Sequence, residues 1–237
     1  MDTARRDLQH AALLGLPALV LAVAGLFHPH RLGPDSAARW TVLHLAGLVV
    51  FPLVGLALAA LVRGRGDAMA WGVRVTAYVY ATAYSALDVI SGIGAGYVTW
   101  RLGGGVERPD EVRFLFSIGG RIGEVGSWAL IACAAVLAID AMRHRGWAAL
   151  PGVLLVPGAL LVHVGHIFAP TGVAGMVLIG VATAWLAPRS ADRPAAQRGW
   201  EQGSEPGVWR RSPSGVSARL RAPTARRRSR GWRDGPG

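Results

Sequence analysis

Long apolar runs separated by short polar connectors dominate the sequence from Ala11 to Leu186. A helix needs about 20 apolar residues to cross a hydrocarbon core of about 30 Å, because each residue adds about 1.5 Å. Lipid offers no hydrogen-bond partners, so the backbone N–H and C=O groups of such a run must pair within a helix. The pattern therefore predicts an all-α, polytopic membrane protein.

Six segments have this character, which predicts a six-helix transmembrane bundle over residues 1–187. The predicted spans cover residues 11–27, 41–62, 70–100, 114–142, 147–169 and 171–187. Pro170 separates the last two, because proline cannot continue a helix in register. Ala22-Val23-Ala24 resembles a signal-peptidase site, but the apolar run continues to Phe27, which favours an uncleaved first span.

Residues 188–237 have a different character. They are rich in Pro, Gly, Ser and Arg, and they hold twelve arginines against four acids, a net of +8 out of +11 for the whole chain. This composition predicts a disordered, arginine-rich tail that could contact anionic lipid. All 25 basic residues are arginine, which is typical of a GC-rich bacterial genome and disfavours nucleic acid as the partner.

The arginines of the connectors predict the orientation of the chain in the bilayer. Nine of them lie on the same side as the amino terminus and five on the other side. Connectors rich in arginine remain in the cytoplasm. The expected location is therefore the bacterial inner membrane, with both termini and the tail cytoplasmic.

Ionisable side chains within the predicted spans gather in the half of the membrane that faces outward. Charged and titratable groups are costly at this depth and indicate function. His163 and His166 lie three residues apart and share one helix face. We expect them to form a pocket with side chains of three other spans, which are His44, Asp88 and Glu124.

Two further contacts are predicted in this region. Arg121 and Glu124, three residues apart, predict a structural ion pair. Pairs of small residues four apart let helices approach closely, and they predict that the third and fourth spans pack together and bring Asp88 toward that ion pair. These pairs are Gly92 with Gly96 and Gly119 with Gly123. His28 and His30, beside Pro29, are expected to be solvated or to cap the first span.

Three classes of function remain open. The favoured class is a pocket for a metal or small cation, in transport or sensing, since imidazole and carboxylate bind divalent transition metals. The alternative is a structural or partner-binding protein whose polar groups join helices. A haem b electron carrier held by His44 and one of the paired histidines, or an intramembrane metal hydrolase, ranks third. No nucleophile elbow, phosphate loop or zincin helix occurs, which disfavours an enzyme.

Overall fold

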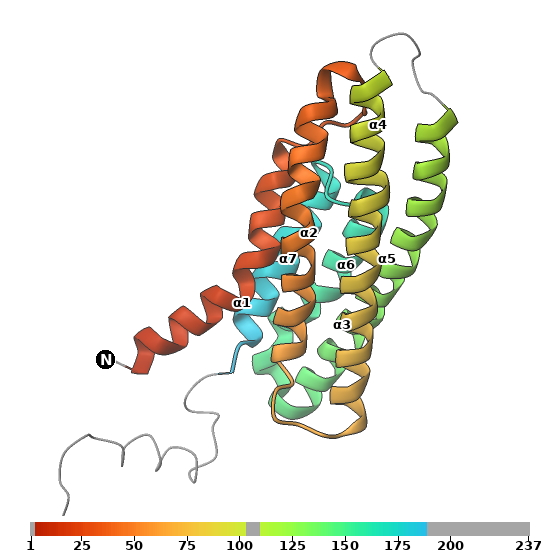
Figure 1. Cartoon of the computed structure of the whole chain (residues 1–237). Coiled ribbons are helices and arrows are strands. Elements are labelled where there is room, and N and C mark those ends of the chain that lie inside the picture. Colours follow the sequence, from red (N-terminus) through yellow and green to blue (C-terminus); the bar gives the residue numbers. More distant parts are fainter. Residues whose placement is uncertain (1–2, 103–109, 189–237) are drawn as a thin grey trace, which may run out of the picture. The chain divides into compact units, whose positions relative to one another are not determined.

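The computed structural model describes residues 3–102 and 110–188, and 88% of these residues are helical, with no strand among them. The predicted all-α fold is therefore confirmed (Figure 1). Apart from Pro188, the predicted tail lies outside the described residues, as does the connector at 103–109.

Seven α-helices and three other helical segments follow one another in the described residues. They are α1 (Thr3–Leu26), η1 (Pro34–Ser36), α2 (Ala37–Ala60), α3 (Ala68–Leu87), η2 (Asp88–Gly94), α4 (Ala95–Leu102), α5 (Asp110–Arg145), η4 (Gly146–Leu154), α6 (Leu155–Gly165) and α7 (Thr171–Leu186). The segments η1 and η4 are 3₁₀-helices, whereas η2 is a π-helix.

Three segments of the described chain, not six, are long and apolar enough to cross a membrane. These are Thr3–Leu26, Pro34–Ala60 and Asp110–Gly165. The third predicted span is divided into α3, η2 and α4, and it carries Arg74 and Asp88. The fourth and fifth run together through η4, and α7 has only 16 residues. The division into six spans is therefore not confirmed, although each predicted span is helical.

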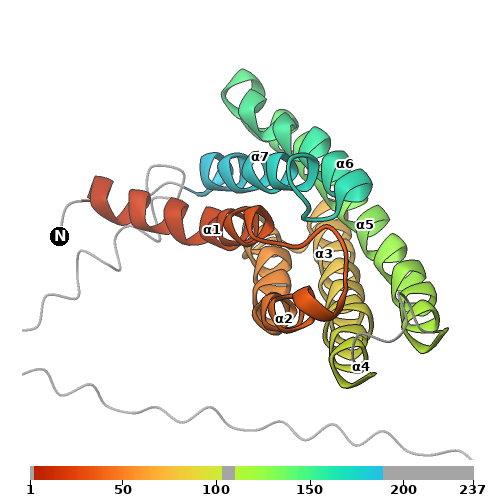
Figure 2. The same cartoon turned by 90° about the horizontal axis from the view of Figure 1, so that it is seen from above.

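Several pairs of helices that are distant in sequence pack against each other. Helix α1 contacts α7 and α2, α3 contacts α5 and α2, and α6 contacts α7 and α5 (Figures 1 and 2). Glycine permits the closest of these crossings. A Cβ atom at Gly15 on α1 would lie 2.7 Å from the carbonyl oxygen of Gly180 on α7, so neither helix could approach so closely with larger residues.

The third and fourth predicted spans do pack together, but only one of the two glycine pairs lies at that contact. Gly92 and Gly96 lie against α2, where added Cβ atoms would meet His44 and Thr41. Gly119 and Gly123 of α5 lie against Ser91 and Leu87 instead. The segment holding Asp88 does pack on α5, but its glycine face turns toward α2. The prediction that Asp88 approaches Arg121 and Glu124 is therefore wrong, since Asp88 lies beside Gly47 of α2.

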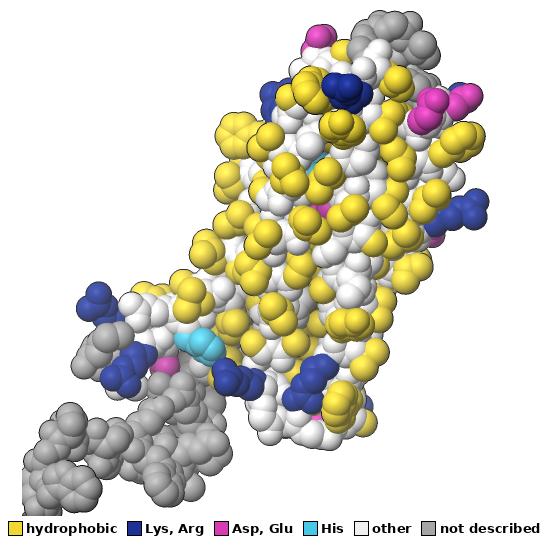
Figure 3. All heavy atoms as spheres, viewed as in Figure 1, with side chains coloured by type: hydrophobic (Ala, Val, Ile, Leu, Met, Phe, Trp, Pro, Cys, Tyr) yellow, Lys and Arg dark blue, Asp and Glu magenta, His cyan; other side chains and the backbone are white. Residues whose placement is uncertain are grey.

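The surface of the bundle carries many large apolar side chains. Leu13, Val42, Tyr78 and Val164 are each more than 60% exposed, and exposed apolar residues occur on every long helix. On the face drawn in Figure 3, hydrophobic side chains cover the middle, while most charged side chains lie toward the two ends. We name these the η1 end, which holds residues 27–36, and the Arg65 end, which holds residues 61–67.

Candidate functional site

A cavity of about 400 Å³, partly open to the surface, lies in the half of the bundle nearer the η1 end. Helices α2, α3, α5 and α6, the segment η2 and the turn after α6 all contribute to its wall. Its lining combines four aromatic rings, three imidazoles and one carboxylate. The residues are Trp40, Tyr84, Phe116, Phe168, His44, His163, His166 and Glu124. Four of the five residues predicted from the sequence thus line one cavity.

His163 is held by a chain of hydrogen bonds across the cavity wall. The Ser127 hydroxyl donates to the backbone carbonyl of Glu124 over 2.9 Å, and His163 Nδ1 lies 2.8 Å from the same hydroxyl oxygen. Because the hydroxyl proton is already used, Nδ1–H of His163 donates to Ser127 Oγ. The other ring nitrogen, Nε2, is therefore left as an acceptor.

His166 occupies an unusual backbone position after the end of α6. It is the one non-glycine residue in the described ranges with a positive φ, at 49°. L residues rarely adopt this region, and such positions cluster at functional sites. Its half-buried ring stacks on Tyr84 with 5.4 Å between ring centroids and on Phe51 with 5.8 Å. The turn thus directs the imidazole into the aromatic wall of the cavity.

Asp88, the fifth predicted residue, does not line this cavity. It begins the π-helix η2, is fully buried, and lines a second cavity of about 30 Å³ together with His28 and His44. His44 Nε2 lies 4.0 Å from Asp88 Oδ1. Neither carboxylate oxygen has a hydrogen-bond partner. Only His44, among the predicted residues, lines both cavities.

His28 is the residue that the sequence analysis misplaced. It is only 5% exposed rather than solvated, and its ring lies 5.0 Å from that of His44 and 4.7 Å from that of Trp40. Burial lowers the pKa of His28 to about 4, so the ring is neutral near neutral pH. Its neighbour His30 is exposed, as expected. In the sequence, only Pro29 beside His28 indicates that the chain turns there, and the structure buries both residues.

The predicted ion pair between Arg121 and Glu124 does not form. Both side chains are exposed on α5, and no ion pair within 4 Å joins them among the described residues. Exposed pairs contribute little, so nothing forces these two side chains together. Glu124 instead provides the carboxylate of the large cavity.

The predicted metal ligands do not gather around one point. A zinc ion holds its nitrogen and oxygen ligands at about 2 Å, so those ligands must converge closely. In the described ranges, no group of three or more His, Cys, Asp or Glu side chains is arranged to hold a metal ion. The five predicted residues are divided between two cavities of very different size.

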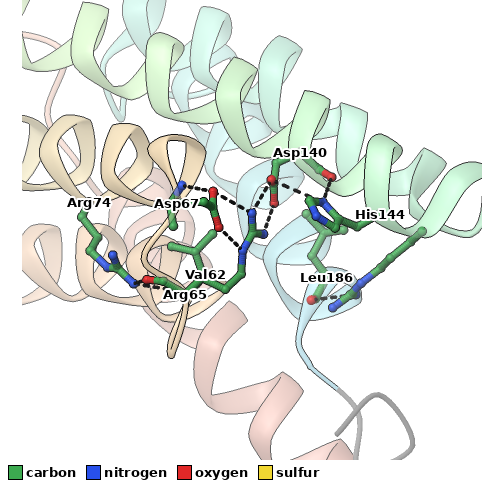
Figure 4. A network of polar contacts seen from close by, with 9 residues as sticks. Val62, Arg65, Asp67, Arg74, Asp140, His144 and Leu186 are labelled. Carbon is green, nitrogen blue, oxygen red and sulfur yellow. Dashed lines mark hydrogen bonds and ion pairs between the residues drawn. The ribbon is translucent and has the colours of Figure 1, made fainter. Parts of the chain in front are cut away.

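A second polar group lies at the Arg65 end, and we call it the Arg65 network (Figure 4). Arg65 donates two hydrogen bonds to Asp140, of 2.5 and 2.8 Å, and two to Asp67, of 2.9 and 3.0 Å. Asp67 also caps α3 by accepting from the Ala70 amide. The Arg65 guanidinium lowers the pKa of Asp67 to about 2.

The Arg65 network joins parts of the chain that are far apart in sequence. His144 Nδ1 donates to the Asp140 carbonyl, while Arg74 donates to the carbonyls of Val62 and Arg65. Opposite charges at the same predicted depth could have indicated this network. Its donors and acceptors are paired with one another, which is the arrangement expected of a structural contact.

Comparison of the chain with models of protein families, with characterised proteins and with solved structures found no match. Function is therefore inferred from the geometry of the two cavities.

Proposed function

We propose that this chain is a polytopic protein of a bacterial inner membrane that binds a small organic cation in its large cavity. Residues 1–187 form six spans, both termini are cytoplasmic, and the arginine-rich tail at 188–237 lies against anionic lipid. The exposed apolar side chains between the two charged ends support membrane insertion, because soluble monomers rarely expose large apolar patches. In this orientation the η1 end faces outward.

The observation that carries the ligand proposal is the lining of the large cavity. Its volume of about 400 Å³ suits a small organic molecule, since such ligands occupy pockets of about 300–1,000 Å³ with a few polar groups. Aromatic faces attract cations, and a carboxylate neutralises the charge of a bound cation. Trp40, Tyr84 and Phe116 supply rings, and Glu124 supplies the carboxylate.

The same cavity suits a bare metal ion poorly. Its volume is far larger than one ion, and its potential ligands do not converge. A groove of about 450 Å³ between α1 and α7 is a weaker candidate for any ligand. Apart from Asp7, it has almost wholly apolar walls, so it lacks groups that would orient a polar molecule. The large cavity thus combines volume with specific chemistry.

Equilibrium binding tests the proposal. Purified protein is titrated by calorimetry with choline and with its neutral isostere, 3,3-dimethylbutan-1-ol. We expect choline to bind and the isostere to bind at least about tenfold more weakly, which corresponds to about 1.4 kcal/mol. Glu124→Gln should remove that preference, whereas Arg121→Gln, one turn away and outside the cavity lining, should retain it. Equal affinity for both probes, or no change in Glu124→Gln, would refute the proposal.

Two simple measurements separate this ligand from the metal and haem alternatives. A Soret band in the absorption spectrum of the wild type, absent from that of His44→Ala, would identify the ligand as haem b and not as an organic cation. One metal ion per chain in elemental analysis, lost in the double variant His163→Ala, His166→Ala, would identify the ligand as a metal ion. We expect neither.

The proposed topology is tested separately. A tag at Gly103–Gly105, which lies outside the described residues, should react with a membrane-impermeant reagent from the outside of intact cells. Labelling only after permeabilisation would show that the chain has the opposite orientation, with the large cavity on the cytoplasmic side.

A further inference from the structure

The small cavity of about 30 Å³ is lined by a group that we call the acceptor cluster, which consists of His28, His44 and Asp88. The three side chains come from the turn after α1, from α2 and from the first residue of η2. Their exposed fractions are 5%, 6% and 0%. They therefore form a buried polar site distinct from the wall of the large cavity, and the two are linked only by His44.

Backbone hydrogen bonds fix which ring nitrogens are acceptors. His44 Nδ1 lies 2.8 Å from the Trp40 carbonyl, and His28 Nδ1 lies 2.8 Å from the Pro29 carbonyl. A carbonyl only accepts, so both Nδ1 atoms carry the proton, and Nε2 of each neutral ring carries a lone pair. The Nε2 atom of His28 has no hydrogen-bond partner.

Asp88 adds two more acceptors and no donor. Both of its oxygens lack a partner, and the nearest basic atom is His44 Nε2 at 4.0 Å. With neutral imidazoles and an ionised carboxylate, the cluster would be a buried group of acceptors with a net charge of −1. Buried charges without partners are strongly disfavoured and are removed by taking up a proton.

We propose that the acceptor cluster is a proton-binding site that holds one proton between Asp88 Oδ1 and His44 Nε2. Protonation of the carboxylate forms the O–H bond, makes the cluster neutral and supplies the missing donor. Transfer to His44 breaks that bond and forms Nε2–H, which leaves an imidazolium beside a carboxylate with the same net charge. The small cavity has room for one water molecule to bridge the 4.0 Å between the two atoms.

A glycine lies against each of the two groups that share the proton. A Cβ atom at Gly47 would lie 2.5 Å from Asp88 Oδ2, and one at Gly92 would overlap the His44 ring. Asp88 also begins a π-helix, a feature that occurs frequently at functional sites. The two glycines thus make room for the unpaired carboxylate and for the imidazole.

Few other titratable groups face this site. His30 and Arg39 interact electrostatically with His28, as Tyr80 and Tyr84 do with Asp88. His166 interacts electrostatically with both His28 and His44. Helix α1 contributes only Val20, Leu21 and Ala24 to the small cavity. No second carboxylate lies among its lining residues, so Asp88 is the acid that the proton neutralises.

Infrared difference spectroscopy of the full protein without added ligand tests this site. A protonated carboxylic acid has a C=O stretching band that a carboxylate lacks. We expect such a band near neutral pH in the wild type, absent in Asp88→Asn. The band should persist in Asp140→Asn and in Glu124→Gln, which remove the buried carboxylate of the Arg65 network and the carboxylate of the large cavity.

A second variant keeps the test decisive if Asp88→Asn does not fold. In His44→Ala the acid loses its acceptor, so the band should shift to the frequency of a free carboxylic acid. Identical spectra for wild type and Asp88→Asn at every pH where both are folded would overturn the proposal, as would an unshifted band in His44→Ala. Neither result depends on the large cavity binding any ligand.

Discussion

Two aspartates, each at least 95% buried, define the two ends of the bundle in opposite ways. At the Arg65 end, Asp140 accepts two hydrogen bonds from Arg65. Nearer the η1 end, Asp88 accepts none. Removing one partner of a buried ion pair is strongly destabilising, whereas a buried acid without a partner must be offset by other contacts and is found where function requires it. The same residue type thus indicates structure at one end and function at the other.

The largest expected effect is on stability at the Arg65 end. Asp140→Ala removes the acceptor of two charge-assisted hydrogen bonds and leaves Arg65 with only Asp67. We expect the free energy of unfolding to fall by about 3 kcal/mol. Denaturant unfolding in detergent measures it, with Asp67→Asn as the exposed control, which retains a capping residue for α3 and should lose much less. Equal losses would mean that burial of Asp140 is unimportant.

The next effect concerns pH at the η1 end. The pKa of His28 is lowered from 6.5 to about 4 by burial, so the folded state resists protonation. A lowered pKa gives stability that is fully present above pH 6.5 and is lost as pH falls toward 4. We expect a loss of up to about 3 kcal/mol over this window, at about 1.4 kcal/mol per pKa unit. Thermal unfolding at a series of pH values should show it in wild type and not in His28→Asn.

A smaller effect on the free energy of unfolding is expected at Gly92, which lies against the His44 ring. Gly92→Ala places a methyl group against that ring, and overpacking costs about 1–2 kcal/mol here. Gly120→Ala is the matched control, because no atom lies within 4 Å of its added Cβ and alanine favours a helix. Unfolding midpoints of the two variants should therefore move in opposite directions. A destabilised Gly120→Ala would show that α5 is more tightly packed than described.

The smallest effect is expected at Asp88. Asp88→Asn replaces a buried acid that has no direct hydrogen-bond partner by a neutral amide of nearly the same size, so the free energy of unfolding should change by less than about 1 kcal/mol. Unfolding in the same detergent as for Asp140→Ala provides the direct comparison. A loss as large as that of Asp140→Ala would assign Asp88 a structural role.

The sequence predicted the helical fold and most of the large cavity's polar residues. Apolar periodicity and the free-energy cost of a charge within an apolar run can both be read from local sequence. They were sufficient to predict the titratable residues of the large cavity, which are His44, Glu124, His163 and His166. The direction of each side chain depends on how helices rotate against one another. The π-helix that begins at Asp88 has no simple sequence signal. In this segment the face that carries Gly92 and Gly96 lies toward α2.

Other features required the three-dimensional structure. His28 follows the last apolar residue of its run, and only the path of the chain into η1 buries it. The Arg65 network joins residues 75 positions apart. Division of the chain into spans was less predictable than helicity, because 3₁₀ and π segments connect helices without an intervening loop.

The most direct test of the central claim measures choline binding and stability together in Glu124→Gln and Asp140→Ala. If the η1 end binds ligand and the Arg65 end supports the fold, Glu124→Gln should lose at least about tenfold in choline affinity while its unfolding midpoint stays unchanged. Asp140→Ala should unfold earlier, yet bind choline with the affinity of the wild type under conditions where it is folded. Loss of binding in Asp140→Ala, with full binding in Glu124→Gln, would contradict the account.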